Sequence, residues 1–159
     1  MKKKAIMIVL IVAAIVMILG SVFLFIHISS RDNLNYDIHI NSQGEAEKVL
    51  SIQALNLAPG QTRQYTLNLL SQSAKEYRIR LNFIPKGSGT LQNFITVEIK
   101  AGDVAVTRPL HELFDGTTVD IDSRGADKIF INYIMPENVG NEAQGAQASF
   151  DIRLTVSRM

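Results

Sequence analysis

The chain has 159 residues, with 16 Lys and Arg against 15 Asp and Glu, and it contains no cysteine. Its length is that of one domain of ordinary size, and the lack of cysteine excludes disulfides, thiolate metal sites and a cysteine nucleophile. Three of the basic residues are lysines within the first four positions, so the rest of the chain has 13 basic residues (16 − 3) and 15 acidic ones. These basic residues form no run or stripe, which argues against a nucleic-acid partner.

Residues 1–30 form a leader directed to a membrane. Residues 2–4 are lysines, and the 22 residues 5–26 carry no charge. A helix of that length is about 33 Å long, which is enough to cross the roughly 30 Å hydrocarbon core of a bilayer. The lysines favour a cytoplasmic N-terminus. We therefore predict a transmembrane or signal helix that takes the membrane as its partner and places the rest of the chain outside the cytoplasm.

Two fates of this leader stay open. Signal peptides have apolar regions of about 7–15 residues before a small-x-small cleavage site, and this run is longer. Cleavage after Ser30 would put Ile28 at the third position upstream, where a small residue is preferred. The alternatives are a retained membrane anchor, or a secreted protein released by cleavage near Ser30.

A short polar linker, residues 31–35, precedes a domain over residues 36–159 in which apolar and polar residues alternate. Such a period of two is typical of strands with one face in a core and one in water. The alternating positions are Tyr36, Ile38 and Ile40; Tyr65, Leu67 and Leu69; Tyr77, Ile79, Leu81 and Phe83; Ile95, Val97 and Ile99; Val104 and Val106; Val119 and Ile121; Ile129, Ile131 and Tyr133; and Ala148, Phe150, Ile152, Leu154 and Val156.

The residues between these sets favour turns and one fold class. Several gaps hold a glycine beside proline, lysine, aspartate, arginine or asparagine, as in Pro59-Gly60 and Arg124-Gly125. The alternation slips between Ile52 and Leu55, which predicts a β-bulge. Eight or nine short strands with turns about every ten residues predict an all-β, antiparallel β-sandwich. The sequence leaves jelly-roll and immunoglobulin-like topologies open.

The search for reactive chemistry gives no catalytic, metal or cofactor site. His111-Glu112 begins the H-E-x-x-H zinc motif, but Asp115 stands where the second histidine belongs. Asp120 and Asp122 lie in an acid-rich stretch without calcium-loop spacing, and they flank Ile121, so we expect them on the solvent face of a strand. No G-x-S-x-G turn is present. We predict a protein that is not an enzyme.

The most distinctive segment of the sequence leads into the last strand. It contains Pro136, Gly140, Asn141, Glu142, Gln144 and Gly145. In the structural interpretation, proline ends a strand and the two glycines adopt backbone angles closed to other residues. In the functional interpretation, the same residues form a polar contact surface at one end of the sandwich.

Several segments resemble those of a known group of proteins. They read "LAPGQ" at residues 57–61, "LNLLSQS" at 67–73, "LQNFITVEI" at 91–99 and "MPENVGNEAQGAQASFDIRLTV" at 135–156. Together they resemble the TasA/camelysin group of exported surface and biofilm-matrix proteins of Gram-positive bacteria. The resemblance implies a jelly-roll-like sandwich, export by a signal peptide and, in several members, assembly into extracellular fibres.

Two functional hypotheses follow. The first is a structural protein of the cell surface or matrix that forms or anchors fibres, with itself or other matrix proteins as partners. Its candidate donor strand, with Tyr36, Ile38 and Ile40, would add to an open sheet edge of the next subunit. The second is a membrane-anchored adhesion module whose loops bind a protein or polymer.

Overall fold

The computed structural model describes residues 34–71, 76–87, 89–143 and 145–159. The chain divides into two compact units, Met1–Asn33 and Leu34–Met159, and the second unit holds the β domain. The predicted leader helix lies outside the described residues. Within the described part of the chain, no helix has the length and apolar character needed to cross a membrane.

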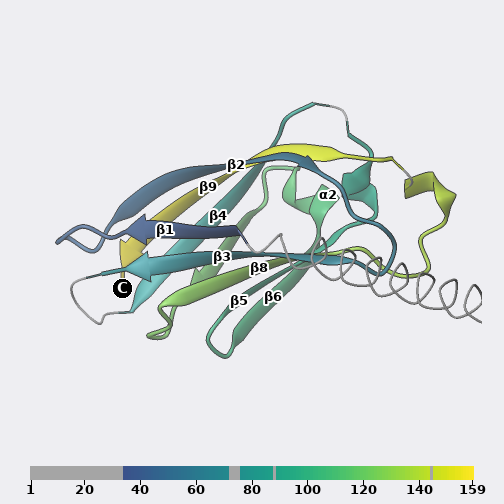
Figure 1. Cartoon of the computed structure of the whole chain (residues 1–159). Coiled ribbons are helices and arrows are strands. Elements are labelled where there is room, and N and C mark those ends of the chain that lie inside the picture. Colours follow the sequence, from purple (N-terminus) through teal and green to yellow (C-terminus); the bar gives the residue numbers. More distant parts are fainter. Residues whose placement is uncertain (1–33, 72–75, 88, 144) are drawn as a thin grey trace, which may run out of the picture. The chain divides into compact units, whose positions relative to one another are not determined.

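The described residues form nine strands and three short helical turns (Figure 1). The strands are β1 (Leu34–His39), β2 (Ala46–Leu55), β3 (Thr62–Leu70), β4 (Tyr77–Pro85), β5 (Thr96–Ala101), β6 (Val104–Pro109), β7 (Thr118–Asp122), β8 (Lys128–Ile134) and β9 (Ala148–Arg158). The helical turns are η1 (Leu91–Asn93), α2 (Leu110–Leu113) and η2 (Asn141–Ala143). Leu34 and Asn35 belong to β1 and not to the predicted linker, because both pair with β3.

The strands build two sheets of a β-sandwich, as predicted. The five-stranded sheet has the order β1-β3-β8-β5-β6, and the four-stranded sheet has the order β2-β9-β4-β7. Apart from the β5–β6 hairpin, each connection between consecutive strands passes from one sheet to the other. This order differs from the ABED and CFG sheets of immunoglobulin domains and follows the jelly-roll pattern.

One strand departs from the predicted antiparallel arrangement. β1 pairs with β3 in parallel, from Leu34 opposite Tyr65 to His39 opposite Leu70. The cause is the route of the chain: β2 lies in the other sheet, so the chain returns to the five-stranded sheet running in its original direction. Parallel neighbours require such a crossover. The antiparallel prediction is wrong for β1, and the sheet pairings of the other strands are antiparallel.

The core consists of the alternating apolar side chains predicted from the sequence, which face inward from both sheets. Nearly all of them are buried, whereas Tyr36, Val104 and Val106 on the edge strands are partly buried. Aromatic rings cross the core from one sheet to the other. The rings of Tyr65 and Tyr133 meet edge to face with their centroids 5.4 Å apart, and the ring centroids of Tyr133 and Phe150 are 5.7 Å apart.

The predicted bulge in β2 is present. The register between β2 and β9 shifts between Ile52 and Leu55, and Ala54 inside this shift has a φ of 51°. The Ala54 backbone N–H donates to Ser149 Oγ at 3.1 Å, so the bulged backbone keeps a hydrogen-bond partner.

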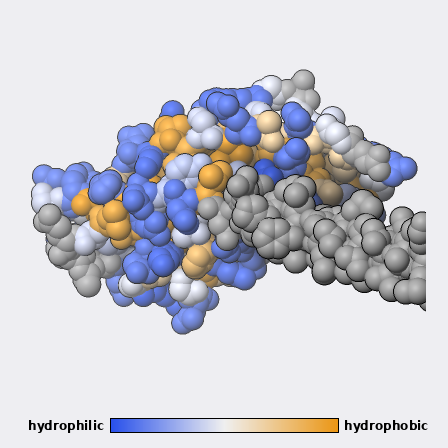
Figure 2. All heavy atoms as spheres, in the orientation of Figure 1, coloured by the Kyte–Doolittle hydropathy of each residue, from blue (hydrophilic) through white to orange (hydrophobic). Residues whose placement is uncertain are grey.

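On the surface of the domain, hydrophilic residues cover most of the face drawn in Figure 2, with hydrophobic residues exposed between them.

Candidate functional site

One lateral side of the sandwich is closed by contacts between the edge strands β1 and β2. Lys48 Nζ of β2 donates to the Asp37 carbonyl of β1 at 2.6 Å. Within the five-stranded sheet, Asn68 Nδ2 of β3 donates to Asp37 Oδ1 at 2.8 Å. We call these two edge strands and their bridge the closed side. Lys48 lies in the inward-facing phase of β2, which is why it reaches the other sheet.

The candidate donor strand is part of this closed side. Ile38 is 1% exposed and Ile40 is 7% exposed, and Tyr36 stacks on Tyr65 with the ring centroids 6.2 Å apart. The Ile40 backbone N–H donates to the Leu70 carbonyl at 2.9 Å. The three predicted residues therefore fill the edge of their own chain's sheet.

The opposite side of the sandwich, between the edge strands β6 and β7, holds a depression of about 290 Å³. We call this the open side. The residues that line the depression are Arg78, Val104, Asp120, Ile121, Asp122 and Arg124. Val104 and Ile121 give it an apolar part, and the other four side chains give it a charged part of zero formal net charge.

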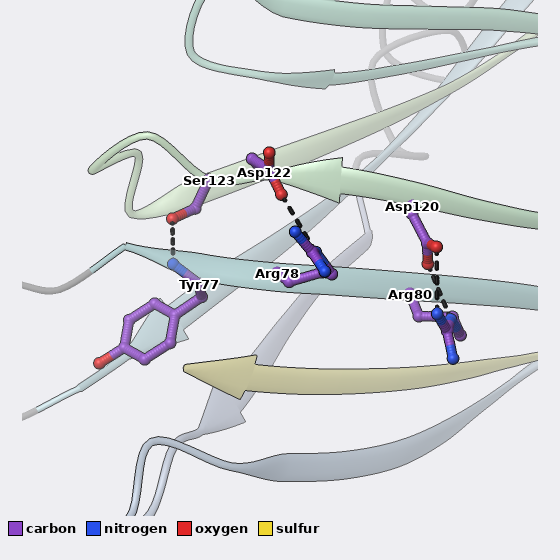
Figure 3. Close-up of polar contacts among 6 residues, drawn as sticks. All are labelled: Tyr77, Arg78, Arg80, Asp120, Asp122 and Ser123. Carbon is purple, nitrogen blue, oxygen red and sulfur yellow. Dashed lines mark hydrogen bonds and ion pairs between the residues drawn. The ribbon is translucent and has the colours of Figure 1, made fainter. Parts of the chain in front are cut away.

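Two Arg–Asp pairs bridge β4 and β7 beside this depression (Figure 3). Arg80 Nε contacts Asp120 Oδ1 at 2.8 Å, and Arg80 Nη2 contacts Asp120 Oδ2 at 3.1 Å. Arg78 Nε lies 3.5 Å from Asp122 Oδ1, a single and longer contact. The antiparallel register explains both pairs, since Arg78 stands opposite Asp122 and Arg80 opposite Asp120.

The Arg80–Asp120 pair favours the charged forms of both its side chains. The hydrogen bond from Arg80 lowers the pKa of Asp120, and the same bond raises the pKa of Arg80. The four side chains lie on the outward phase of β4 and β7, and Asp120 is exposed. The predicted solvent face for Asp120 and Asp122 is confirmed, but the sequence did not show that both carboxylates pair with arginines of another strand.

A tight turn after β7 fixes the end of the depression. Ser123 is fully buried: its N–H donates to the Tyr77 carbonyl at 2.8 Å, and its Oγ accepts from the Tyr77 N–H at 2.9 Å (Figure 3). Arg124 and Gly125 follow with φ of 46° and 82°, and the Ala126 N–H donates to the Ser123 carbonyl at 2.8 Å. Positive φ at both central residues defines a type I′ turn, which favours Asn or Gly. Arg124 is thus held in an unfavoured conformation beside the depression.

The distinctive loop lies at the other end of the sandwich. It follows the last residue of β8, whereas the turn with Arg124 precedes the first, so the structure does not bring the loop and the depression together. Its beginning is fixed by two backbone bonds, from Met135 N–H to the Gln61 carbonyl at 2.9 Å and from Gly60 N–H to the Met135 carbonyl at 3.0 Å. Its middle is fixed by Ala143, which is 3% exposed.

The predicted residues of the loop behave differently from one another. Pro136 follows the end of β8, Asn141 and Glu142 are exposed in η2, and Gln144 lies outside the described residues. Gly145 has a φ of 72°, as expected. For Gly140 the prediction is wrong: its φ is not positive, and an added Cβ would meet nothing within 4 Å.

Sequence reasoning assigned none of the six residues of the depression to a site: it expected Asp120 and Asp122 on a solvent face, and it placed Val104 and Ile121 in the core phase. Arg124-Gly125 indicated a turn, but no local pattern indicated that Arg124 shares a depression with Val104 of β6. Among the residues that the structure describes, no group of three or more His, Asp and Glu is placed to hold a metal ion. His111 and Glu112 are exposed on α2.

No protein-family model matches the chain, and no curated protein sequence matches it. Solved structures with a similar fold include the following three. PliG of Salmonella Typhimurium, a periplasmic inhibitor of g-type lysozyme, is 10% identical with a TM-score of 0.40, over 79% of this chain and 99% of that one. FLHE is 12% identical with a TM-score of 0.47, over 73% and 99%. The CUB1-EGF-CUB2 domains of rat MASP-1 are 12% identical with a TM-score of 0.39, over 78% and 43%. At these values the likeness assigns no function.

Proposed function

We propose that this chain is a non-enzymatic protein of the cell surface or extracellular matrix that works through contacts with other protein surfaces, including copies of itself. The observation that carries the proposal is the open side of the sandwich. There, two arginines and two aspartates line an open depression next to β6, an edge strand of the five-stranded sheet. Such a rigid, charged and shallow surface suits contact with another macromolecule.

The chemistry of this surface supports contact over catalysis. A general acid or base works best when its pKa lies near the working pH. Asp120 departs from that condition in the wrong direction, because Arg80 lowers its pKa. The resemblance to the TasA/camelysin group and the lysine-flanked apolar leader support an extracytoplasmic location.

The location is tested by measuring the mass and N-terminal sequence of the mature protein in the membrane and medium fractions of producing cells. A chain that starts at Met1 and occurs in membranes fits a surface-anchored protein. A chain that starts near Arg31 and occurs in the medium fits a released matrix protein. A full-length chain that fractionates with cytoplasmic proteins, and that protease added to intact cells leaves uncut, contradicts the proposal.

Strand donation between subunits is a second part of the hypothesis. β1 is the first strand, lies at a sheet edge and packs Tyr36 and Ile38 against β3. The same groove of a neighbouring subunit would accept this strand once it left its own. Cleavage of the leader is required, since an anchored N-terminus does not move freely between subunits. Deleting residues 33–40 tests this route: fibres that persist without them exclude it.

The alternative function is a membrane-anchored adhesion module that binds a protein or polymer through its loops. The anchoring of the distinctive loop at Met135 and Ala143 favours it, since a loop held at these residues is preorganised for contact. Replacing exposed Asn141 and Glu142 by alanine distinguishes the alternatives. If the chain is an adhesion module, this double change would abolish adhesion and leave self-association unchanged.

A further inference from the structure

The four edge strands of the sandwich differ in how far they are protected against pairing with another chain. Edge strands are commonly protected by bulges, inward-pointing charges, short length or covering groups. β2 has a bulge at Ala54 and the inward-phase Lys48. β1 has its Asp37 carbonyl covered by that lysine. β7 is short, at five residues.

β6 has no bulge in its pairing with β5, and its inward-phase charge, Arg108, stands only at the second-last residue, before Pro109. Its hairpin with β5 closes through Gly102 and Asp103, so Ala101 and Val104 form the hydrogen-bonded pair that flanks the turn. Hydrogen-bonded and non-hydrogen-bonded pairs alternate along an antiparallel ladder. The backbone N–H and C=O groups of Ala105 and Thr107 therefore point away from β5, toward the open edge.

The side chains at these two positions leave that edge accessible. Ala105 and Thr107 are exposed, small and uncharged, and Pro109 ends the strand. Figure 1 shows the β5–β6 hairpin at the border of its sheet, with β5 on one side of β6 only.

We propose that the β6 edge binds the β6 edge of a second copy of this chain, in antiparallel orientation across a two-fold axis. This inference deepens the proposed function and rests on it. A two-fold axis through Val106 places Ala105 opposite Thr107 of the second copy, and Thr107 opposite its Ala105. Both members of each pair have outward-pointing backbone groups, so the register forms about four main-chain hydrogen bonds and joins two sheets into one.

The charges of β6 and of the depression agree with this register. Arg108 then stands opposite Val104 of the second copy, with both side chains on the inner phase of the strand. Val104 lines the depression together with Asp122. Arg108 is exposed, and the described residues give it no ion pair. Asp122 has a single long contact with Arg78, so its carboxylate retains acceptor capacity for a second guanidinium.

The register makes a strict geometric prediction about cross-linking. Residues that face each other in a non-hydrogen-bonded pair have Cα atoms about 4.5 Å apart, within the range that a disulfide spans. Val106 faces itself across the axis, whereas Ala105 faces Thr107. Two copies of Ala105 lie farther apart, at a diagonal distance of about 7–8 Å, beyond the usual span of a disulfide.

The test uses the cysteine-free full-length chain in intact producing cells. Val106→Cys and Ala105→Cys are each made alone, and cells are oxidised mildly with copper–phenanthroline, which accepts the two electrons of disulfide formation. We expect a reducible dimer band for Val106→Cys on a non-reducing gel. The Ala105→Cys variant, which changes the neighbouring and more exposed position, should give about tenfold less dimer.

A charge exchange tests the second contact. In the Val106→Cys background, Arg108→Glu and Asp122→Lys should each lower the cross-linked fraction severalfold, and the combination of both should restore much of it. Circular dichroism of the purified full-length variants in detergent checks that each one is folded. If a charge variant is unfolded, its loss of dimer is not interpreted, and the comparison of Val106→Cys with Ala105→Cys decides the question.

Three outcomes overturn the inference: no dimer for Val106→Cys, equal dimer for both cysteine variants, or a cross-link to a different protein. None of these affects the proposed surface function, which fails separately if the chain fractionates with cytoplasmic proteins. A dimer that depends on Val106 and Arg108, but not on leader cleavage, supports an interface separate from strand donation at β1.

Discussion

The two lateral sides of this sandwich have the same secondary structure and opposite chemistry. On the closed side, β1 buries Ile38 and Lys48 of β2 reaches across to the Asp37 carbonyl. On the open side, Val104 and Val106 of β6 stay partly exposed, and the charged groups near them pair within the four-stranded sheet. The comparison teaches that the first described strand completes one side of this sandwich, whereas on the other side β6 borders only β5 within its sheet.

The largest effect that tests this comparison is expected at the buried face of β1. Ile38→Ala should lower the free energy of unfolding by about 2–4 kcal/mol, because it leaves a cavity against β3. Val106→Ala, the matched change on the open side, should cost less than about 1 kcal/mol because this side chain is only partly buried. Chemical denaturation of the two purified full-length variants gives both values. Equal losses would show that the two sides are equally packed.

A smaller effect is expected at the turn that ends the depression. Ser123→Ala removes the acceptor for the Tyr77 N–H and leaves that buried group without its bond. We expect a loss of about 1–2 kcal/mol in the same denaturation experiment. Ser157→Ala, at an exposed position of β9, serves as the control and should change the free energy of unfolding by less than about 0.5 kcal/mol. An equal effect of the two changes would contradict a stabilising role of the hydrogen bond between Ser123 and Tyr77.

The bridge between β1 and β2 should contribute still less. Lys48→Ala removes its hydrogen bond to the Asp37 carbonyl, at a cost of about 0.5–1 kcal/mol because the contact is partly exposed to water. Amide hydrogen exchange should show faster opening of β1 in this variant and unchanged exchange in β6. A uniform increase over both strands would mean that the bridge does not act locally.

The smallest effect is expected from the pH dependence of the ion pairs. Folding lowers the pKa of Asp120 through Arg80 and that of Asp151 through Lys86. A lowered pKa means that the unfolded chain binds protons first as the pH falls. The stability that these two carboxylates contribute is fully present above the ordinary pKa range of a carboxyl group. It is lost as the pH falls through the lower pKa values of the folded state. Thermal unfolding over acidic pH should therefore show a smaller pH slope for Asp120→Asn than for the parent, and an unchanged slope would remove this contribution.

Local pattern was enough to predict most of the core. The period of two in residues such as Ile129, Ile131 and Tyr133 identifies the inward face because side chains alternate along any strand. The slip between Ile52 and Leu55 predicted the bulge for the same reason. The same alternation on both sides of Ile121 predicted that Asp120 and Asp122 lie on the solvent face of their strand. One inward residue was not anticipated in its chemistry: the Tyr133 hydroxyl is buried without a hydrogen-bond partner among the described residues.

What the sequence by itself determined is which face of each strand is buried, since that depends on neighbours within a few residues. The tertiary structure decided which strands lie next to one another, because pairing joins residues such as Arg78 and Asp122 that are far apart in the chain. It therefore also decided that β1 runs parallel to β3, and that Val104 and Arg124 share one depression. On the open side two edge strands meet, one from each sheet, and in the part of the chain that the structure describes no side chain joins them by a hydrogen bond or ion pair as Lys48 joins β2 to β1.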